Sequence, residues 1–83
     1  MEVKVIDIIP AKLVADVGAI ELFKYINNLE EKDILVNFAA IDYMNISFAL
    51  EYVNQKNLSS KNVSEINLLK EYKELLELAD NSY

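Results

Sequence analysis

A run of branched and aromatic side chains in the middle of the chain, Ile34-Leu35-Val36-Asn37-Phe38, most constrains what this sequence can fold into. An apolar run of this length is typical of a strand that is covered on both faces, as strands in parallel sheets are. A short turn-and-strand connection is expected after it, over residues 39–44. We therefore predict that residues 34–38 form the central strand of a sheet with helices packed against it.

The segment before this strand predicts a further strand and a helix. Residues 2–9 are rich in β-branched side chains, and Pro10 ends that run because proline cannot donate to a sheet ladder. From Asp16 to about Glu30 the apolar residues recur at helical spacing, with Asp16 as the expected N-cap.

The second half of the chain repeats this order. Asn45 is expected to cap a helix from Ile46 to about Gln55, with Ile46, Ala49, Leu50 and Val53 as its apolar stripe. A polar loop over residues 56–62 precedes a short third strand at 63–67. The clearest helical pattern covers residues 68–79.

Alternation of strands and helices predicts a small α/β domain with a parallel or mixed sheet and right-handed crossovers. We expect about three to four strands and three helices in two or three layers, in one domain over residues 2–79, with residues 80–83 as a tail. The strand order stays open. Three strands are few for such a sheet, and a second copy of the chain would complete its edges or helix faces.

Gly18, the only glycine, falls in the first turn of a predicted helix, where glycine costs up to about 1 kcal/mol relative to alanine. Either another backbone or a ligand approaches closely there, or the helix begins later. A packing explanation is favoured, because isolated helical glycines are usually packing features. A ligand pocket would lie here, near the carboxyl end of the central strand, if the chain were a ligand-binding domain or an enzyme.

The charge balance disfavours nucleic acid as a partner. The chain has 14 acidic and 8 basic residues, a formal net charge of -6, and all its basic residues are lysines. Binding to phosphates needs clustered positive charge, whereas an acidic surface suits a basic protein partner. The chain has no apolar run of the ~18 residues that span a bilayer and no basic-then-apolar leader, so a cytoplasmic protein without a membrane segment is expected.

The residues that most catalytic centres need are missing. Histidine and cysteine are absent, which excludes the usual nucleophile arrangements and zinc sites, and one glycine cannot build a phosphate-binding loop. The carboxylates at Glu71, Glu74 and Glu77 are expected on the solvent face of a helix. We therefore predict no catalytic residue, no metal site and no cofactor, and a protein that is not an enzyme.

The stretch from Val36 to Leu50, VNFAAIDYMNISFAL, resembles the STAS class of anti-sigma-factor antagonists. In that family a central strand ends in a pattern similar to LDLSxVxFMDSSGL, whose phosphorylatable serine opens a helix. Ser47-Phe48-Ala49-Leu50-Glu51 is more similar still to a STAS-like family of unknown function, whose helix begins S-F-A-[DE]. Asn67-Leu68 before the last helix also resembles it, and the general layout covers residues 3–79. The resemblance implies a STAS-like fold and a protein partner that docks near the start of this helix.

This chain departs from the STAS pattern at the phosphorylated position. When Tyr43-Met44 is aligned with the pattern, its aspartate falls on Asn45 and its phosphorylated serine falls on Ile46, which has no hydroxyl. Ser47 matches the serine that follows. Ser47 is therefore either a displaced phosphosite or, as is more usual in a first helical turn, a helix-start residue.

The candidate partner-binding residues are Tyr43, Asn45, Ser47, Phe48 and Tyr52. Tyr43, Phe48 and Tyr52 form an aromatic patch if they lie on the side of the helix away from its apolar stripe. The alternative is that the helix is packed on two sides in a small core. The leading hypothesis is a STAS-like regulatory adaptor or antagonist. The alternatives are a self-associating structural or assembly protein that forms a homodimer, and then the enzyme or ligand-binding domain.

Overall fold

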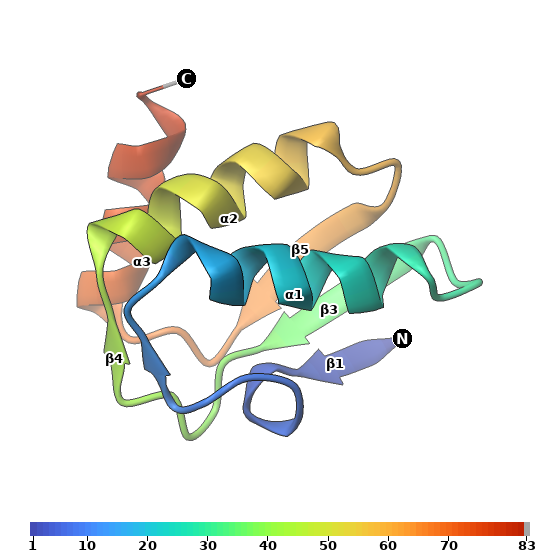
Figure 1. Ribbon diagram of the computed structural model, residues 1–83, viewed down its shortest axis with the longest axis horizontal. Helices are drawn as coiled ribbons and strands as arrows, with labels where there is room; N and C mark the ends of the chain where they lie inside the picture. The colour runs from blue at the N-terminus through green and yellow to red at the C-terminus, as the bar shows by residue number, and fades with distance from the viewer. Residues whose placement is uncertain (83) are drawn as a thin grey trace.

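The computed structural model describes residues 1–82, in which strands and helices alternate along the chain (Figure 1). A single 3₁₀ turn at Val5–Asp7 follows the first strand. The elements are β1 (Glu2–Lys4), β2 (Lys12–Leu13), α1 (Asp16–Asn27), β3 (Asp33–Asn37), β4 (Tyr43–Met44), α2 (Ile46–Leu58), β5 (Asn62–Ile66) and α3 (Lys70–Asp80).

The main sheet is parallel, with strand order β1-β3-β5, so the predicted central strand is confirmed as central. Val3 is in register with Val36, and Val36 with Glu65. Each connection moves one strand further in the same direction, and right-handed crossovers of that kind place their helices on one face. Figure 1 shows α1 and α2 side by side over that face. The small α/β class with three helices is confirmed.

The sheet is covered on one face, and the prediction that β3 is covered on both is wrong. Ile34 and Val36 are buried beneath the helices, whereas Leu35, which points to the opposite face, is only partly buried. Glu2 and Lys4 of β1 alternate with buried Val3 in the same way. Because both crossovers run in the same direction across the sheet, from β1 to β3 and from β3 to β5, their helices cover the same face and none covers the other.

The first strand is shorter than the sequence predicts. It stops at Lys4 because the chain turns through the 3₁₀ segment, where the Val5 carbonyl accepts bonds from the amides of Ile8 and Ile9, each at 3.0 Å. The apolar residues of this turn, above all Val5, are buried without being in the sheet. β-branched composition alone does not distinguish a buried turn from a strand.

A second, two-stranded parallel sheet was not predicted. Lys12 is in register with Tyr43 and Leu13 with Met44, so the two segments that lead into α1 and α2 are held together. The Asp42 amide donates to the Ala11 carbonyl at 3.1 Å, and the Asn45 amide to the Leu13 carbonyl at 2.9 Å. Pairing of two two-residue strands depends on tertiary placement and has no sequence pattern of its own.

Four aromatic rings fill the centre of the core. Tyr52 lies with its ring centroid 5.3 Å from that of Phe23, 5.7 Å from that of Phe38 and 5.9 Å from that of Phe48. The predicted apolar stripe of α2 is therefore wrong in part, because Phe48 and Tyr52 face the core while Ile46 is 43% exposed. Large rings bury more apolar area than isoleucine or leucine, so they decide which side of the helix faces inward.

Helix ends differ from the predicted ones by a few residues. The N-cap of α1 is Ala15, and Asp16 is the first helical residue, its carboxylate accepting from the Val17 amide at 2.8 Å. The helix α1 ends at Asn27, α2 continues to Leu58, and α3 includes Asp80. Tyr83, the last residue of the predicted tail, lies outside the described residues.

The carboxyl ends of β3 and β5 are joined by two asparagines. The buried Asn37 side-chain oxygen accepts from the Asn67 side-chain amide and from the Ala39 backbone amide, both at 2.9 Å. Asn67 has a positive φ of 59°, a conformation that asparagine adopts more readily than most residues. This pair fixes the turn by which the chain leaves β5 for α3.

Gly18 lies inside the first turn of α1, next to the Phe48 ring of α2. A Cβ added there would be 3.5 Å from Ile9 Cδ1 and 3.6 Å from Phe48 Cδ2, which is ordinary van der Waals contact. The close approach is therefore real, but there is room for a methyl group and the helix does not begin later.

We expect Gly18→Ala to raise the free energy of unfolding by about 0.5–1 kcal/mol, since alanine loses less backbone entropy in a helix. Urea denaturation followed by circular dichroism measures this. Glu21→Gly, on the exposed side of the same helix, is the control and should cost about 1 kcal/mol. A less stable Gly18→Ala variant would show that the α1–α2 contact is too tight for a methyl group.

Candidate functional site

The structure separates the five predicted site residues into two groups. Tyr43 is 44% exposed, Ser47 is exposed and Asn45 is partly buried, all near the start of α2. Phe48 and Tyr52 are 0% and 1% exposed. The prediction of an aromatic surface patch is therefore wrong, and the alternative that both rings belong to the core is correct.

Asn45 joins the start of α2 to the start of α1. Its side-chain oxygen accepts from the Phe48 amide at 3.1 Å, which confirms the predicted cap, and its side-chain amide donates to the Val14 carbonyl at 2.9 Å. The Asn45 side chain thus caps α2 and also hydrogen-bonds the backbone between β2 and α1. This double bonding holds the beginnings of the two helices next to each other.

Ser47 borders a shallow hollow between these two helix starts. The hollow has a volume of about 430 Å³, and its lining includes Val14, Asp16, Ser47, Leu50 and Glu51. Two carboxylates, those of Asp16 and Glu51, therefore line the same hollow as Ser47. A phosphate at this position would gain from the helix N-terminus but would be repelled by both carboxylates.

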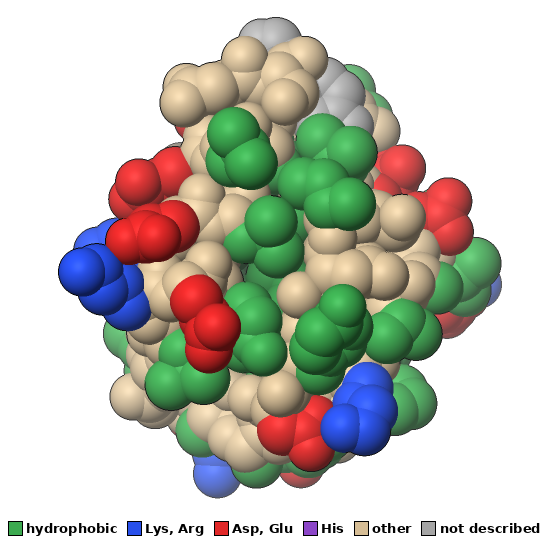
Figure 2. Space-filling view, turned by 90° about the vertical axis from the view of Figure 1, so that its left-hand side faces the viewer, with side chains coloured by type: hydrophobic (Ala, Val, Ile, Leu, Met, Phe, Trp, Pro, Cys, Tyr) green, Lys and Arg blue, Asp and Glu red, His purple; other side chains and the backbone are tan. Residues whose placement is uncertain are grey.

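The segments that lead into α1 and α2 also carry exposed apolar side chains, a feature that the sequence analysis missed. We call Val14, Val17, Tyr43 and Ile46 the helix-start patch; they are 53%, 59%, 44% and 43% exposed. Figure 2 shows the face of the molecule on which the helices begin, with a band of hydrophobic side chains and acidic groups beside it. The apolar residues after Pro10 and at Ile46 are visible in the sequence, but their spacing does not indicate that they are neighbours. The pairing of β2 with β4 brings these two segments together.

A second feature is a partly buried polar network below α2. The Tyr52 hydroxyl donates to Glu65 Oε2 at 2.8 Å, and the Lys56 ammonium donates to both Glu65 oxygens at 2.9 and 3.2 Å. Burial, and then the negative charge and hydrogen bond of Glu65, hold the pKa of Tyr52 well above its usual value. The network fixes the edge strand β5 to α2.

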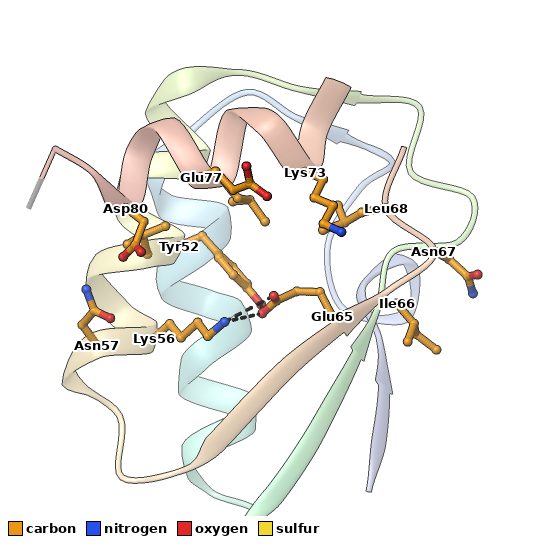
Figure 3. Close-up of a pocket in the computed structure, with 12 residues that line it drawn as sticks. Tyr52, Lys56, Asn57, Glu65, Ile66, Asn67, Leu68, Lys73, Glu77 and Asp80 are labelled. Carbon is orange, nitrogen blue, oxygen red and sulfur yellow. Dashed lines mark hydrogen bonds and ion pairs between the residues drawn. The ribbon is translucent and has the colours of Figure 1, made fainter. Parts of the chain in front are cut away.

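This network lies at the bottom of a groove between α2, β5 and α3 (Figure 3). The groove has a volume of about 460 Å³. Lys56 and Glu65 meet in its centre, while Lys73, Glu77 and Asp80 come from α3 along its upper side. The charged groups at its centre, Lys56 and Glu65, form an ion pair with each other that stabilises the fold.

Among residues 1–82, no group of three or more acidic side chains is placed to hold a metal ion. In the same residues, no helix has both the length and the hydropathy that crossing a bilayer requires.

Comparisons of this chain with protein-family models, with curated proteins and with solved structures gave no match. The resemblance to STAS proteins therefore remains a prediction.

We expect Asn45→Ala to lower the free energy of unfolding by about 1–2 kcal/mol, because it removes the cap and leaves the Val14 carbonyl without its donor. Ser47→Ala, two residues along the same exposed turn, is the control and should change stability by less than about 0.5 kcal/mol. Chemical denaturation of both variants measures the difference. Equal losses would mean that Asn45 has no structural role beyond that of any residue at the helix start.

Stability should fall as the pH rises above about 10, since unfolded tyrosine deprotonates there while folded Tyr52 stays protonated. Unfolding then releases a proton, so each increase in pH favours the unfolded chain. The decline should be shallower in Tyr52→Phe than in the wild type, and Tyr25→Phe, at a residue that is 46% exposed, is the control. Urea midpoints between pH 8 and 11 measure it, and identical slopes in all three proteins would contradict the assignment.

Proposed function

We propose that this chain is a protein-interaction module without chemistry of its own, STAS-like in character, which acts in the cytoplasm as a regulatory adaptor or antagonist. The observation that carries the proposal is the helix-start patch. Its apolar side chains are exposed together at one end of the molecule, where the sequence resemblance also leads us to expect partner docking.

The patch has the composition of a docking surface. Val14 and Val17 lie at the start of α1, Tyr43 and Ile46 at the start of α2, and tyrosine is enriched at the centres of protein interfaces. Contiguous exposed apolar side chains with a polar rim are typical of sites that bind another protein. A rigid support also favours binding, and Asn45 with the β2–β4 pair provides it.

The charges around the patch favour a basic partner. Asp16 and Glu51 line the hollow beside it, and Asp42 lies next to Tyr43, its side chain 3.3 Å from that of Lys12. Lys12 offsets the charge of Asp42. In a chain of net charge -6, it is therefore Asp16 and Glu51 that add a local negative potential, which attracts positive surfaces. We infer a partner that presents an apolar contact flanked by lysine or arginine.

A second candidate function, self-association, is favoured by a separate observation, the open edge of β5. The edge and the helix-start patch have no residue in common.

Photo-crosslinking tests the proposal directly. We expect a photoreactive phenylalanine analogue at Tyr43, in cells that express the protein, to give a discrete crosslinked species with a second protein. The same analogue at Leu78, which is 59% exposed on α3, is the control and should not give that species.

A second variant tests whether the patch itself makes the contact. Ile46→Glu adds a negative charge to an exposed position and should leave the fold intact while it abolishes the crosslink from Tyr43. Absence of any species specific to Tyr43, or a species that persists in the folded Ile46→Glu protein, would contradict the proposed site.

A further inference from the structure

The strand β5 leaves one side of its backbone without a partner. The Asn62 amide donates to the Lys32 carbonyl at 2.9 Å, and the Ile66 carbonyl accepts from the Phe38 amide at 3.0 Å. Backbone groups of alternate residues point to opposite sides of a strand, so residues 62, 64 and 66 face β3. The amides and carbonyls of Val63 and Glu65 therefore point outward, and no described strand lies beyond β5.

Apart from Glu65, whose charged side chain points to the helix face, this edge lacks the devices with which proteins usually block strand addition. The other edge of the sheet, β1, has three residues, two of them charged, and ends in a 3₁₀ turn. The edge strand β5 has five residues in regular register with β3, without proline. A regular edge strand that no other strand covers is a template for pairing with another chain.

The space beside the edge is open along the whole strand. One hollow, lined in part by Asn62, Val63 and Ser64, and the groove of Figure 3, lined in part by Glu65 and Ile66, both reach Lys56. Together they follow β5 from its first residue to its last. No strand among residues 1–82 lies in these hollows, so the edge is accessible to a second chain.

The charges around the edge are nearly balanced, unlike those of the whole chain. The two hollows are lined by Lys56, Lys61 and Lys73 against Asp33, Glu65, Glu77 and Asp80. Three lysines against four carboxylates leave a charge of -1, compared with -6 for the chain. Two copies of an acidic protein repel each other least when they meet at such a surface.

We propose that β5 pairs with β5 of a second copy of this chain, antiparallel about a twofold axis at Ser64. In this register Val63 of one copy faces Glu65 of the other, and their outward amides and carbonyls form the hydrogen-bonded pairs of an antiparallel ladder. Ser64 faces its own counterpart on the open face of the sheet. Its small, exposed side chain suits the close spacing of such a pair.

This pairing would join two three-stranded sheets into one continuous sheet of order β1-β3-β5-β5-β3-β1. A symmetric contact of this kind closes on itself and leaves no β5 edge for further addition. The inference specifies the surface for the second candidate function, self-association. It leaves the helix-start patch free for a different partner.

Light scattering and amide hydrogen exchange on the wild-type protein test the pairing. The measured mass should approach twice the 9.5 kDa of one chain as concentration rises. The Val63 and Glu65 amides should become protected over the same range, whereas the Ser64 amide, which faces β3, is protected throughout. A monomer at all concentrations, or a dimer whose Val63 and Glu65 amides exchange freely, would overturn the proposal.

Charge variants at the axis provide a second, sharper test. Ser64→Lys and Ser64→Asp each place like charges opposite one another, and each should raise the dimer Kd by roughly five-fold. An equal mixture of the two variants should recover a dimer at least as tight as the wild type, because the charges are then opposite. Ser64 is exposed, so both variants should fold. Unchanged Kd values in both variants would refute the twofold register.

The two proposals fail separately. A crosslink from Tyr43 to another protein that persists in Ser64→Lys, at a concentration where light scattering shows this variant to be monomeric, supports the helix-start patch and shows that docking there does not need the second copy. If Ile46→Glu loses that crosslink but still has the dimer mass and the Val63 amide protection of the wild type, the β5 pairing does not depend on the helix-start patch.

Discussion

The ring of Tyr52 is the contact on which the rest of the structure depends. It lies against Phe23 of α1, Phe48 of α2 and Phe38 after β3, and its hydroxyl donates to Glu65 of β5. One side chain therefore links two helices with the central and an edge strand of the sheet. Since its hydroxyl is buried and Glu65 is only partly exposed, the two stabilise the fold as a hydrogen-bonded set with Lys56. The Tyr52–Glu65 bond thereby fixes the position of β5 and of its outer edge.

Two of the surfaces that remain when this core is complete follow from the direction and order of the strands. Because the strands of the sheet are parallel, both sheet helices begin at the same end of the molecule, where β2 and β4 bring their apolar starts together. The same order places β5 last, with its outward amides and carbonyls unpaired. The helix-start patch is an apolar surface with an acidic rim, whereas the β5 edge is a row of backbone donors and acceptors with balanced charge. Surfaces so different in chemistry can serve different partners.

Much of the fold could be predicted from the sequence, and the failures have specific physical causes. The run at residues 34–38 and the cap at Asn45 were identified correctly, since burial and local hydrogen bonding leave strong patterns. Phe48 and Tyr52 were assigned to a possible surface because helical spacing shows which residues share a face but not which face turns inward. The site proposed from the structure is therefore still at the start of α2, but it excludes the two buried aromatic residues. It includes the exposed residues Val14, Val17 and Ile46, which the sequence did not indicate.

The sequence by itself determined the alternation of strands and helices, the single core and the absence of histidine and cysteine chemistry, because these depend on composition and on local periodicity. Only the tertiary structure decided the strand order, the bare face of the sheet, the β2–β4 pair and the outward direction of the Val63 and Glu65 backbone. Such features arise from contacts between residues distant in sequence, such as Val3 with Val36. The sequence of one segment does not predict these contacts, because the same alternation of apolar and polar residues is compatible with several different neighbouring strands.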